Sequence, residues 1–289
     1  MNLPVVSEVW LVLREAVRRF LSVNGLFLAS ALAFSLLLYS VPLVLLVVAA
    51  LGQTVVESDR ALAEIQAILR QILPDIEQTA VEGLATAAAH RRALGLYGLV
   101  LFALFSTTTF GTARFALNVL FGVERRRGFF RGMGVDALMI VLLAALFAAT
   151  IALNSALGAA RAAGDSVPFV GPILRSDWFI ASELLGTLFI LALCYLVYRV
   201  CPARSLRPRG LVVAALTTTV LLEIFRWAFG WYAASVRHMT VLYGAIGGLV
   251  LFILWLYYSA AVFFFGAAVG WAVDRRPPVR ASSLNDQFR

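Results

Sequence analysis

The sequence predicts an all-α integral membrane protein with six transmembrane helices, and two observations lead to this fold class. Of the 289 residues, 62% are hydrophobic and only 14% are charged, whereas soluble domains have about 45–50% apolar and about 25% charged residues. The apolar residues also form runs long enough to cross the roughly 30 Å hydrocarbon core of a bilayer at about 1.5 Å per residue. These runs, the six predicted crossings, cover residues 26–51, 93–112, 135–160, 178–198, 211–233 and 242–273.

The arginines are distributed unevenly between the two predicted sides of the membrane. All 24 basic residues are arginine. Sixteen lie at the N-terminus, in the second connection (Arg114 among them), in the fourth connection and in the polar tail 274–289. Seven lie on the opposite side, and Arg226 lies inside a crossing. Because short cytoplasmic connections collect basic residues, both termini are predicted to be cytoplasmic. This topology accounts for the net charge of +8.

Basic residues in the second connection also suggest a partner. Arg125, Arg127 and Arg131 could contact anionic lipid head groups on the cytoplasmic side. The chain has no aromatic-interleaved basic groove of the kind that binds nucleic acid, so we expect no nucleic-acid partner.

Residues 1–25 are predicted to form an interfacial helix on the cytoplasmic leaflet. Apolar residues such as Trp10, Val17 and Phe20 recur there at helical spacing, with Arg14 and Arg18 on the other side. In the first crossing that follows, Pro42 is expected to introduce a kink.

The external segment 53–92 is predicted to contain two short amphipathic helices separated by Pro74 and Asp75. They could cap the outer face of the bundle or gate a vestibule. The other long external connection, between residues 161 and 177, is expected to resist helix because it contains Gly171 and Pro172.

The last crossing contains two pairs of glycines at a spacing of four. Gly244 with Gly248 and Gly266 with Gly270 allow close approach of another helix. That helix could belong to the same bundle or to a second copy of the chain, so a homodimer is possible. Cys194 and Cys201 lie near the reducing cytoplasmic side, where no disulfide is expected.

Glu223 and Arg226 lie inside the fifth crossing, where the bilayer is hydrocarbon. A charge there costs several kcal/mol, so such residues mark a functional site by default. Their spacing of three puts them on one helical face, about 20 Å and about 24 Å from the cytoplasmic entry. Glu183, which enters from outside in the fourth crossing, reaches the same layer. Three polar residues near this layer complete the candidate site: Asn154, Thr187 and Thr219.

Two interpretations of this cluster remain open. It could be a neutralised group that locks helices together. It could instead line a hydrated cavity, open to the outside, in which a carboxylate exchanges a proton or pairs with a cationic solute. Two carboxylates and one arginine carry a net charge of −1, which slightly favours the interpretation as a hydrated cavity.

Catalytic chemistry finds little support in the sequence. His90 and His238 are isolated and show no metal-ligand spacing, and neither a nucleophile elbow nor a Walker loop is present. We therefore expect no enzyme activity, no cofactor and no metal site.

Several segments together resemble the YihY/virulence factor BrkB family, which was once labelled ribonuclease BN. They are NGLFLASALAFSLLLYSVPLVLLVVAALG, ARFALNVLFGVERRRGFFR, YRVCPARSLRPRG and LYGAIGGLVLFILWLYYSAAVFFFGA, with Glu223 and a basic residue three positions later in between. The family-motif residues that we expect to be structural are Pro42, Asn118, Arg127, Arg199, Pro202, Arg204, Tyr243 and Gly244.

The resemblance implies a multi-pass protein of the bacterial inner membrane with both termini in the cytoplasm. Members of the family have been linked to virulence, to export of small solutes and to lipid transport. We therefore expect a transporter that exports a small solute or a lipid-linked molecule. The alternative is a scaffold for envelope assembly that transports nothing, and a membrane-bound enzyme is a distant third.

Overall fold

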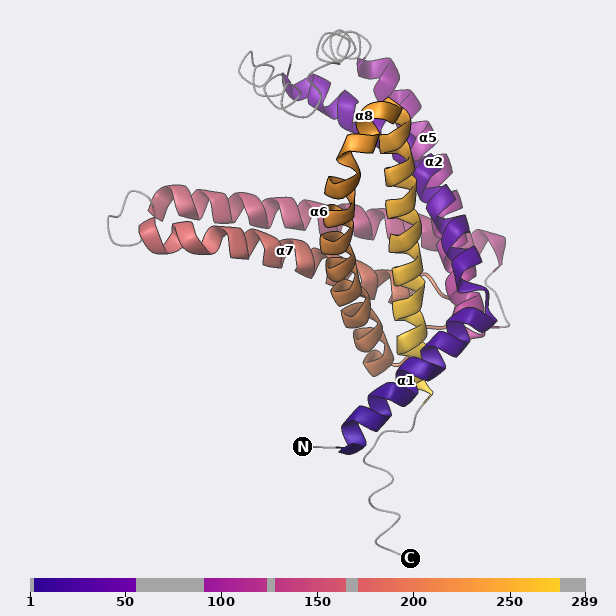
Figure 1. Ribbon diagram of the computed structural model, residues 1–289. Coiled ribbons are helices and arrows are strands. Elements are labelled where there is room, and N and C mark those ends of the chain that lie inside the picture. Colours follow the sequence, from indigo (N-terminus) through magenta and orange to yellow (C-terminus); the bar gives the residue numbers. More distant parts are fainter. Residues whose placement is uncertain (1–2, 56–90, 124–127, 165–170, 276–289) are drawn as a thin grey trace, which may run out of the picture. The chain divides into compact units, whose positions relative to one another are not determined.

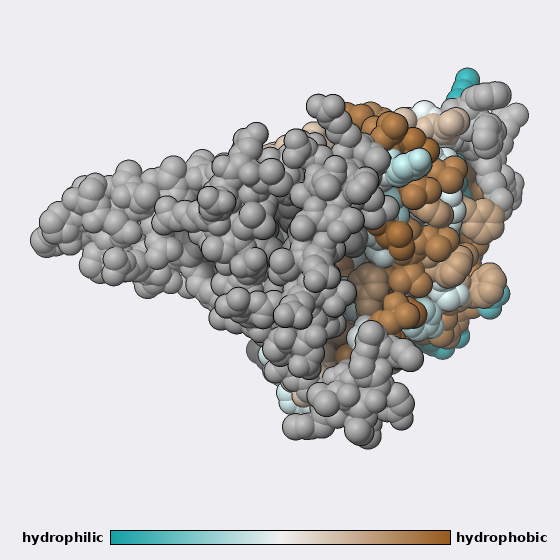
Figure 2. Space-filling model, turned by 90° about the horizontal axis from the view of Figure 1, so that it is seen from above, coloured by the Kyte–Doolittle hydropathy of each residue, from teal (hydrophilic) through white to brown (hydrophobic). Residues whose placement is uncertain are grey.

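The computed structural model describes residues 3–55, 91–123, 128–164 and 171–275, and its regular secondary structure there is all helical. The helices are α1 (Leu3–Ser22), α2 (Gly25–Val55), α5 (Arg91–Phe121), α6 (Phe129–Gly164), α7 (Gly171–Val200) and α8 (Pro208–Asp274), as drawn in Figure 1. The surface of the described residues that is visible in Figure 2 is mostly hydrophobic. An apolar exterior of this kind suits a chain surrounded by lipid.

Six stretches of these helices are long and apolar enough to cross a membrane, as predicted. They are Gly25–Leu43, Leu96–Phe121, Arg131–Thr150, Glu183–Val200, Pro208–Val236 and Gly247–Asp274. The predicted end of the second crossing at residue 112 was wrong, because α5 continues to Phe121. Arg114 therefore lies inside a helix and not in a connection. The orientation of the spans stays a prediction.

Two other expectations concern the connections. The external segment 53–92 lies outside the described residues except at its ends, where residues 53–55 belong to α2 and residues 91–92 to α5. The expectation that the connection 161–177 resists helix was wrong at both ends. The helix α6 continues to Gly164, and α7 begins at Gly171. Pro172 is tolerated there because the N–H groups of a first helical turn have no partner inside the helix.

The fifth and sixth predicted crossings are two arms of α8, which lie side by side (Figure 1). Phe225 stacks on Trp255, and Gly210 meets Gly270. The midpoints of these pairs fall within residues 237–246, so the chain reverses direction there. The side chains of that stretch lie outside the described residues.

Glycine allows backbone contact between the two arms. A Cβ atom on Gly270 would lie 2.5 Å from the carbonyl oxygen of Gly210, and one on Gly266 would collide with Thr218. The packing of Gly266 and Gly270 within one chain is therefore confirmed. Gly248 faces open space, so a second copy of the chain at that position stays a possibility.

Buried polar groups join α7 to both arms of α8. The hydroxyl of Tyr198 lies 2.7 Å from Thr218 Oγ1 and donates to the carbonyl oxygen of Phe263 at 2.6 Å. The tyrosine side chain is fully buried. A buried hydroxyl without such partners would be costly, so these contacts help to fix the relative register of the three helical segments.

The chain divides into two compact units, residues 1–33 with 110–289 and residues 34–109. In the second unit, Thr109 Oγ1 donates to the carbonyl oxygen of Ser35 at 3.2 Å, and the rings of Tyr39 and Phe102 are 5.0 Å apart. Pro42 is buried within α2, and its kink stays a prediction. The candidate site lies entirely in the first unit.

Candidate functional site

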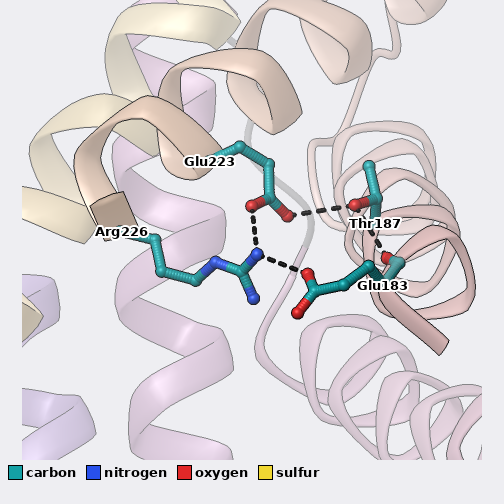
Figure 3. A network of polar contacts seen from close by, with 4 residues as sticks. All are labelled: Glu183, Thr187, Glu223 and Arg226. Carbon is teal, nitrogen blue, oxygen red and sulfur yellow. Dashed lines mark hydrogen bonds and ion pairs between the residues drawn. The ribbon is translucent and has the colours of Figure 1, made fainter. Parts of the chain in front are cut away.

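The structure brings Glu183 of α7 together with Glu223 and Arg226 of α8 (Figure 3). Arg226 Nη2 lies 2.6 Å from Glu183 Oε2 and 2.9 Å from Glu223 Oε2. One guanidinium nitrogen thus pairs with both carboxylates. With two acids and one base, the cluster carries a formal charge of −1.

The fold explains why these residues meet. Glu223 and Arg226 are three residues apart, so they share a helical face. The helix α7 lies across the first arm of α8 (Figure 1), and Glu183 and Thr187, one turn apart on α7, contact Arg226 and Glu223. The three charged residues therefore meet where these two helices cross.

Thr187 belongs to the same cluster, whereas Thr219 does not. Thr187 Oγ1 lies 3.1 Å from Glu223 Oε1 and 3.0 Å from the carbonyl oxygen of Glu183, and its hydroxyl is the donor toward both (Figure 3). Thr219 is buried and donates to the carbonyl oxygen of Ala215 within its own helix. Asn154 lies on α6, but its side chain is outside the described residues.

The cluster is open although it lies within candidate membrane spans. The exposed fraction of the side chain is 53% for Arg226, 43% for Glu183 and 25% for Glu223. Both ion pairs use Nη2, so Arg226 Nε, Arg226 Nη1 and Glu183 Oε1 have no partner among the described residues. Hydrocarbon cannot satisfy such groups, and they therefore require water, a polar ligand or further protein.

Aromatic residues continue the face of Glu223. Trp227 and Trp231 follow it by one and two helical turns, and both are largely exposed. Indole rings can hold a cation by the attraction between its charge and the ring face. An acidic group beside exposed tryptophans is therefore suited to a polar solute that carries a positive charge.

A second ion pair, which the sequence analysis missed, joins α5 to α6. Arg114 Nη1 lies 2.8 Å from Asp136 Oδ1, and the side chains are 21% and 2% exposed. The guanidinium lies against Gly132, where a Cβ atom would be 2.7 Å from Nη1. Asp136 Oδ2 is buried without a partner among the described residues. The available signal was Asp136 itself, an acid one residue inside the predicted third crossing.

The family-motif residues occupy different environments. Asn118 is buried, and its Oδ1 accepts the backbone N–H of Ala203 at 2.7 Å, which ties the connection after α7 to the end of α5. Pro202 is also buried in that connection, whereas Arg199 and Arg204 are exposed. Arg127 lies outside the described residues, as do the side-chain positions of Tyr243 and Gly244.

The family of this chain follows from its match to a protein-family model. The model of the family described as virulence factor BrkB matches residues 16–287, nearly the whole chain. The chain belongs to the virulence factor BrkB family. The resemblance inferred from the sequence segments is thereby confirmed.

Relatives of this BrkB-family chain are known as UPF0761 membrane proteins. The protein from Chromohalobacter salexigens is 30% identical over 274 residues, which cover 91% of this chain and 63% of the relative. The protein from Chromobacterium violaceum is 25% identical over 246 residues, 84% of this chain and 57% of the relative. The chain thus spans about three fifths of the length of these relatives. No solved structure matches the chain.

Proposed function

We propose that this BrkB-family chain is a transport protein of the bacterial inner membrane, which exports a small solute or a lipid-linked molecule. Glu183, Glu223 and Arg226 line its polar path. The observation that carries this proposal is the half-exposed, incompletely paired charge cluster within candidate membrane spans. Intramembrane charges of this kind mark substrate or ion pathways in many membrane proteins.

The chemistry of the cluster suits reversible binding. Glu183 Oε1 can accept a hydrogen bond and Arg226 Nη1 can donate one without breaking either ion pair. The surplus negative charge attracts a positively charged group on the solute, and Thr187 keeps Glu223 oriented through its hydroxyl. Protonation of either carboxylate removes one ion pair of Arg226, which would link solute release to proton binding.

Both termini are proposed to be cytoplasmic, so the cluster lies in the outer half of the membrane and its path opens outward. The arginine distribution supports this orientation. Reporter fusions after residue 22 and after residue 275 should both be active in the cytoplasm. Activity of either fusion outside the inner membrane would contradict the orientation and, with it, the outward path.

A scaffold without transport activity is the second candidate. The ion pair between Glu183 and Arg226 and the hydrogen bonds of Tyr198 join α7 to α8. The same cluster could therefore serve packing alone, and the protein would then organise other envelope components.

The decisive experiment compares exported metabolites from cells that produce the wild-type chain, Glu223→Gln, or no protein. Glu223→Gln removes the charge but keeps the side-chain size. We expect the wild type to enrich specific compounds in the medium and Glu223→Gln to abolish most of that enrichment at equal membrane abundance. Thr219→Val is the matched control, because Thr219 lies one turn away on the same helix and bonds only to its own backbone.

The scaffold is favoured if the wild type enriches no compound, or if Glu223→Gln exports normally while losing thermal stability. Reconstitution in liposomes with the enriched compound then tests whether the chain alone suffices. This second step matters because the chain covers only part of its relatives' length.

A further inference from the structure

Two arginines share one tryptophan where the ends of α1, α5 and α8 meet. Trp271 lies in the last turn of α8 and is 8% exposed. Cζ of Arg19 lies 4.8 Å from the centroid of the Trp271 ring, and Cζ of Arg275 lies 4.3 Å from it. Arg275 is the C-cap residue of α8. Both guanidinium groups therefore lie within cation–π distance of this ring.

Arg19 is held in place by a second set of contacts. Its Nε donates to the carbonyl oxygen of Leu120 at 2.8 Å, and Nη2 donates to that of Val119 at 2.8 Å. These carbonyls end α5, and Gly122 terminates that helix with a φ of +68°. A Cβ atom at position 122 would lie 3.3 Å from Arg19 Nη2, so glycine leaves room for the guanidinium. Arg19 is therefore preorganised.

Neither guanidinium group at this junction forms an ion pair with a carboxylate among the described residues. Asp274, the nearest acid in sequence, accepts the backbone N–H of Arg207 at 2.9 Å. Burial and repulsion from Arg275 lower the pKa of Arg19. The carboxylate of Asp274 and the C-terminal ends of α5 and α8, each about half a negative charge, offset the two positive charges in sum, but they leave N–H donors of both guanidinium groups unoccupied.

We propose that Arg19 and Arg275 form a binding site for a phosphate group. Arg19 Nη1 and the side-chain donors of Arg275 have no partner among the described residues. Guanidinium groups in a fixed orientation recognise phosphate oxygens through paired, charge-assisted hydrogen bonds. The phosphate comes from an anionic lipid head group or from the free ion.

The surface of α1 favours a lipid as the source. Its Ala16 and Phe20 are buried, and Phe20 contacts Phe265 of α8. Trp10, Leu13 and Val17 extend this apolar side and are exposed. A helix whose apolar side is packed in one part and free in another is suited to lie at the lipid surface. A head group at that level could reach the arginine pair.

The site is tested on the purified full chain by counting retained phosphatidylglycerol with native mass spectrometry. Arg275→Gln should bind this lipid roughly tenfold more weakly than wild type, since a charge-assisted contact is lost. Arg209→Gln is the matched control: Arg209 is an exposed arginine in the first turn of α8, and the charge change is identical. Its binding should stay closer to wild type than that of Arg275→Gln, because only Arg19 and Arg275 lie over the Trp271 ring among the described residues.

A second arm uses inorganic phosphate in detergent, with chloride at equal ionic strength, and measures the thermal midpoint. If phosphate raises the thermal midpoint of the wild type and of Arg209→Gln but not that of Arg275→Gln, the ligand is the free ion. If the wild type and Arg209→Gln retain phosphatidylglycerol and Arg275→Gln loses it, the ligand is the lipid head group. Arg275→Lys keeps the charge without the planar stack and should bind at an intermediate level.

Equal binding by Arg275→Gln and Arg209→Gln in both arms overturns the site. The same holds if wild type binds neither probe. The site stands independently of the proposed transport activity, because it lies on other residues and its readouts do not involve flux.

Discussion

The two ion clusters of this protein, each within candidate membrane spans, differ in charge balance and in exposure. Arg114 and Asp136 form a neutral pair between α5 and α6, in which the carboxylate is almost fully buried. Glu183, Glu223 and Arg226 carry one surplus negative charge between α7 and α8, and all three are at least one quarter exposed.

The difference indicates two uses of charge inside a membrane protein. In a neutral buried pair, each charged group has lost its contacts with water and is compensated only by its partner. Removing either partner therefore leaves an uncompensated buried charge. An open cluster keeps access to water or solute, and its ion pairs contribute little to stability. The first arrangement holds two helices together, whereas the second leaves polar groups available for a ligand.

The largest effect on stability is expected for Asp136→Ala. It leaves Arg114 without its counter-charge, and we expect a loss of about 3–5 kcal/mol in the free energy of unfolding. Denaturant unfolding in detergent micelles measures this loss. The double variant Arg114→Leu, Asp136→Leu is the control and should recover much of it, because no unpaired charge remains. A loss below about 1 kcal/mol for Asp136→Ala would contradict the structural role of the pair.

A smaller effect is expected for Gly132→Ala. The new methyl group would lie 2.7 Å from Arg114 Nη1, so the guanidinium must shift, which disturbs its contact with Asp136. We expect a loss of about 1–3 kcal/mol in the same unfolding experiment. Gly134→Ala provides the control, because a Cβ atom there meets nothing within 4 Å. That control should be neutral or slightly stabilising, since alanine favours helix; equal losses at both positions would rule out the steric explanation.

The smallest effect on stability is expected for Glu223→Gln. The variant removes one exposed ion pair, and we expect a change below about 1 kcal/mol, while export falls as described above. A loss of stability comparable to that of Asp136→Ala would mean that both clusters are structural, and the contrast between them would disappear.

The sequence predicted most of the fold because each membrane span appears in it as a long apolar run. It also predicted the meeting of Glu183, Glu223 and Arg226, because the rise per residue converts sequence position into depth. What it could not supply was the end of α5. Arg114 was assigned to a connection because basic residues collect at span ends, yet α5 continues beyond it to Phe121.

Other details depend on contacts that no local pattern records. The spacing of Gly266 and Gly270 predicted close helix packing, but the partner, the first arm of α8 around Gly210, required the three-dimensional structure. Thr219 shares its helical face with Glu223 yet bonds to its own backbone. Helical spacing places a residue on a face but does not choose its hydrogen-bond partner.

The backbone contact at Gly210 and Gly270 has a mechanical consequence. The two arms of α8 touch there without intervening side chains, while bulky rings of Phe225 and Trp255 separate them farther along. A side chain at either glycine would therefore push the two arms apart. Glu223 and Arg226, about 20 Å farther along the first arm, would shift together relative to Glu183 of α7.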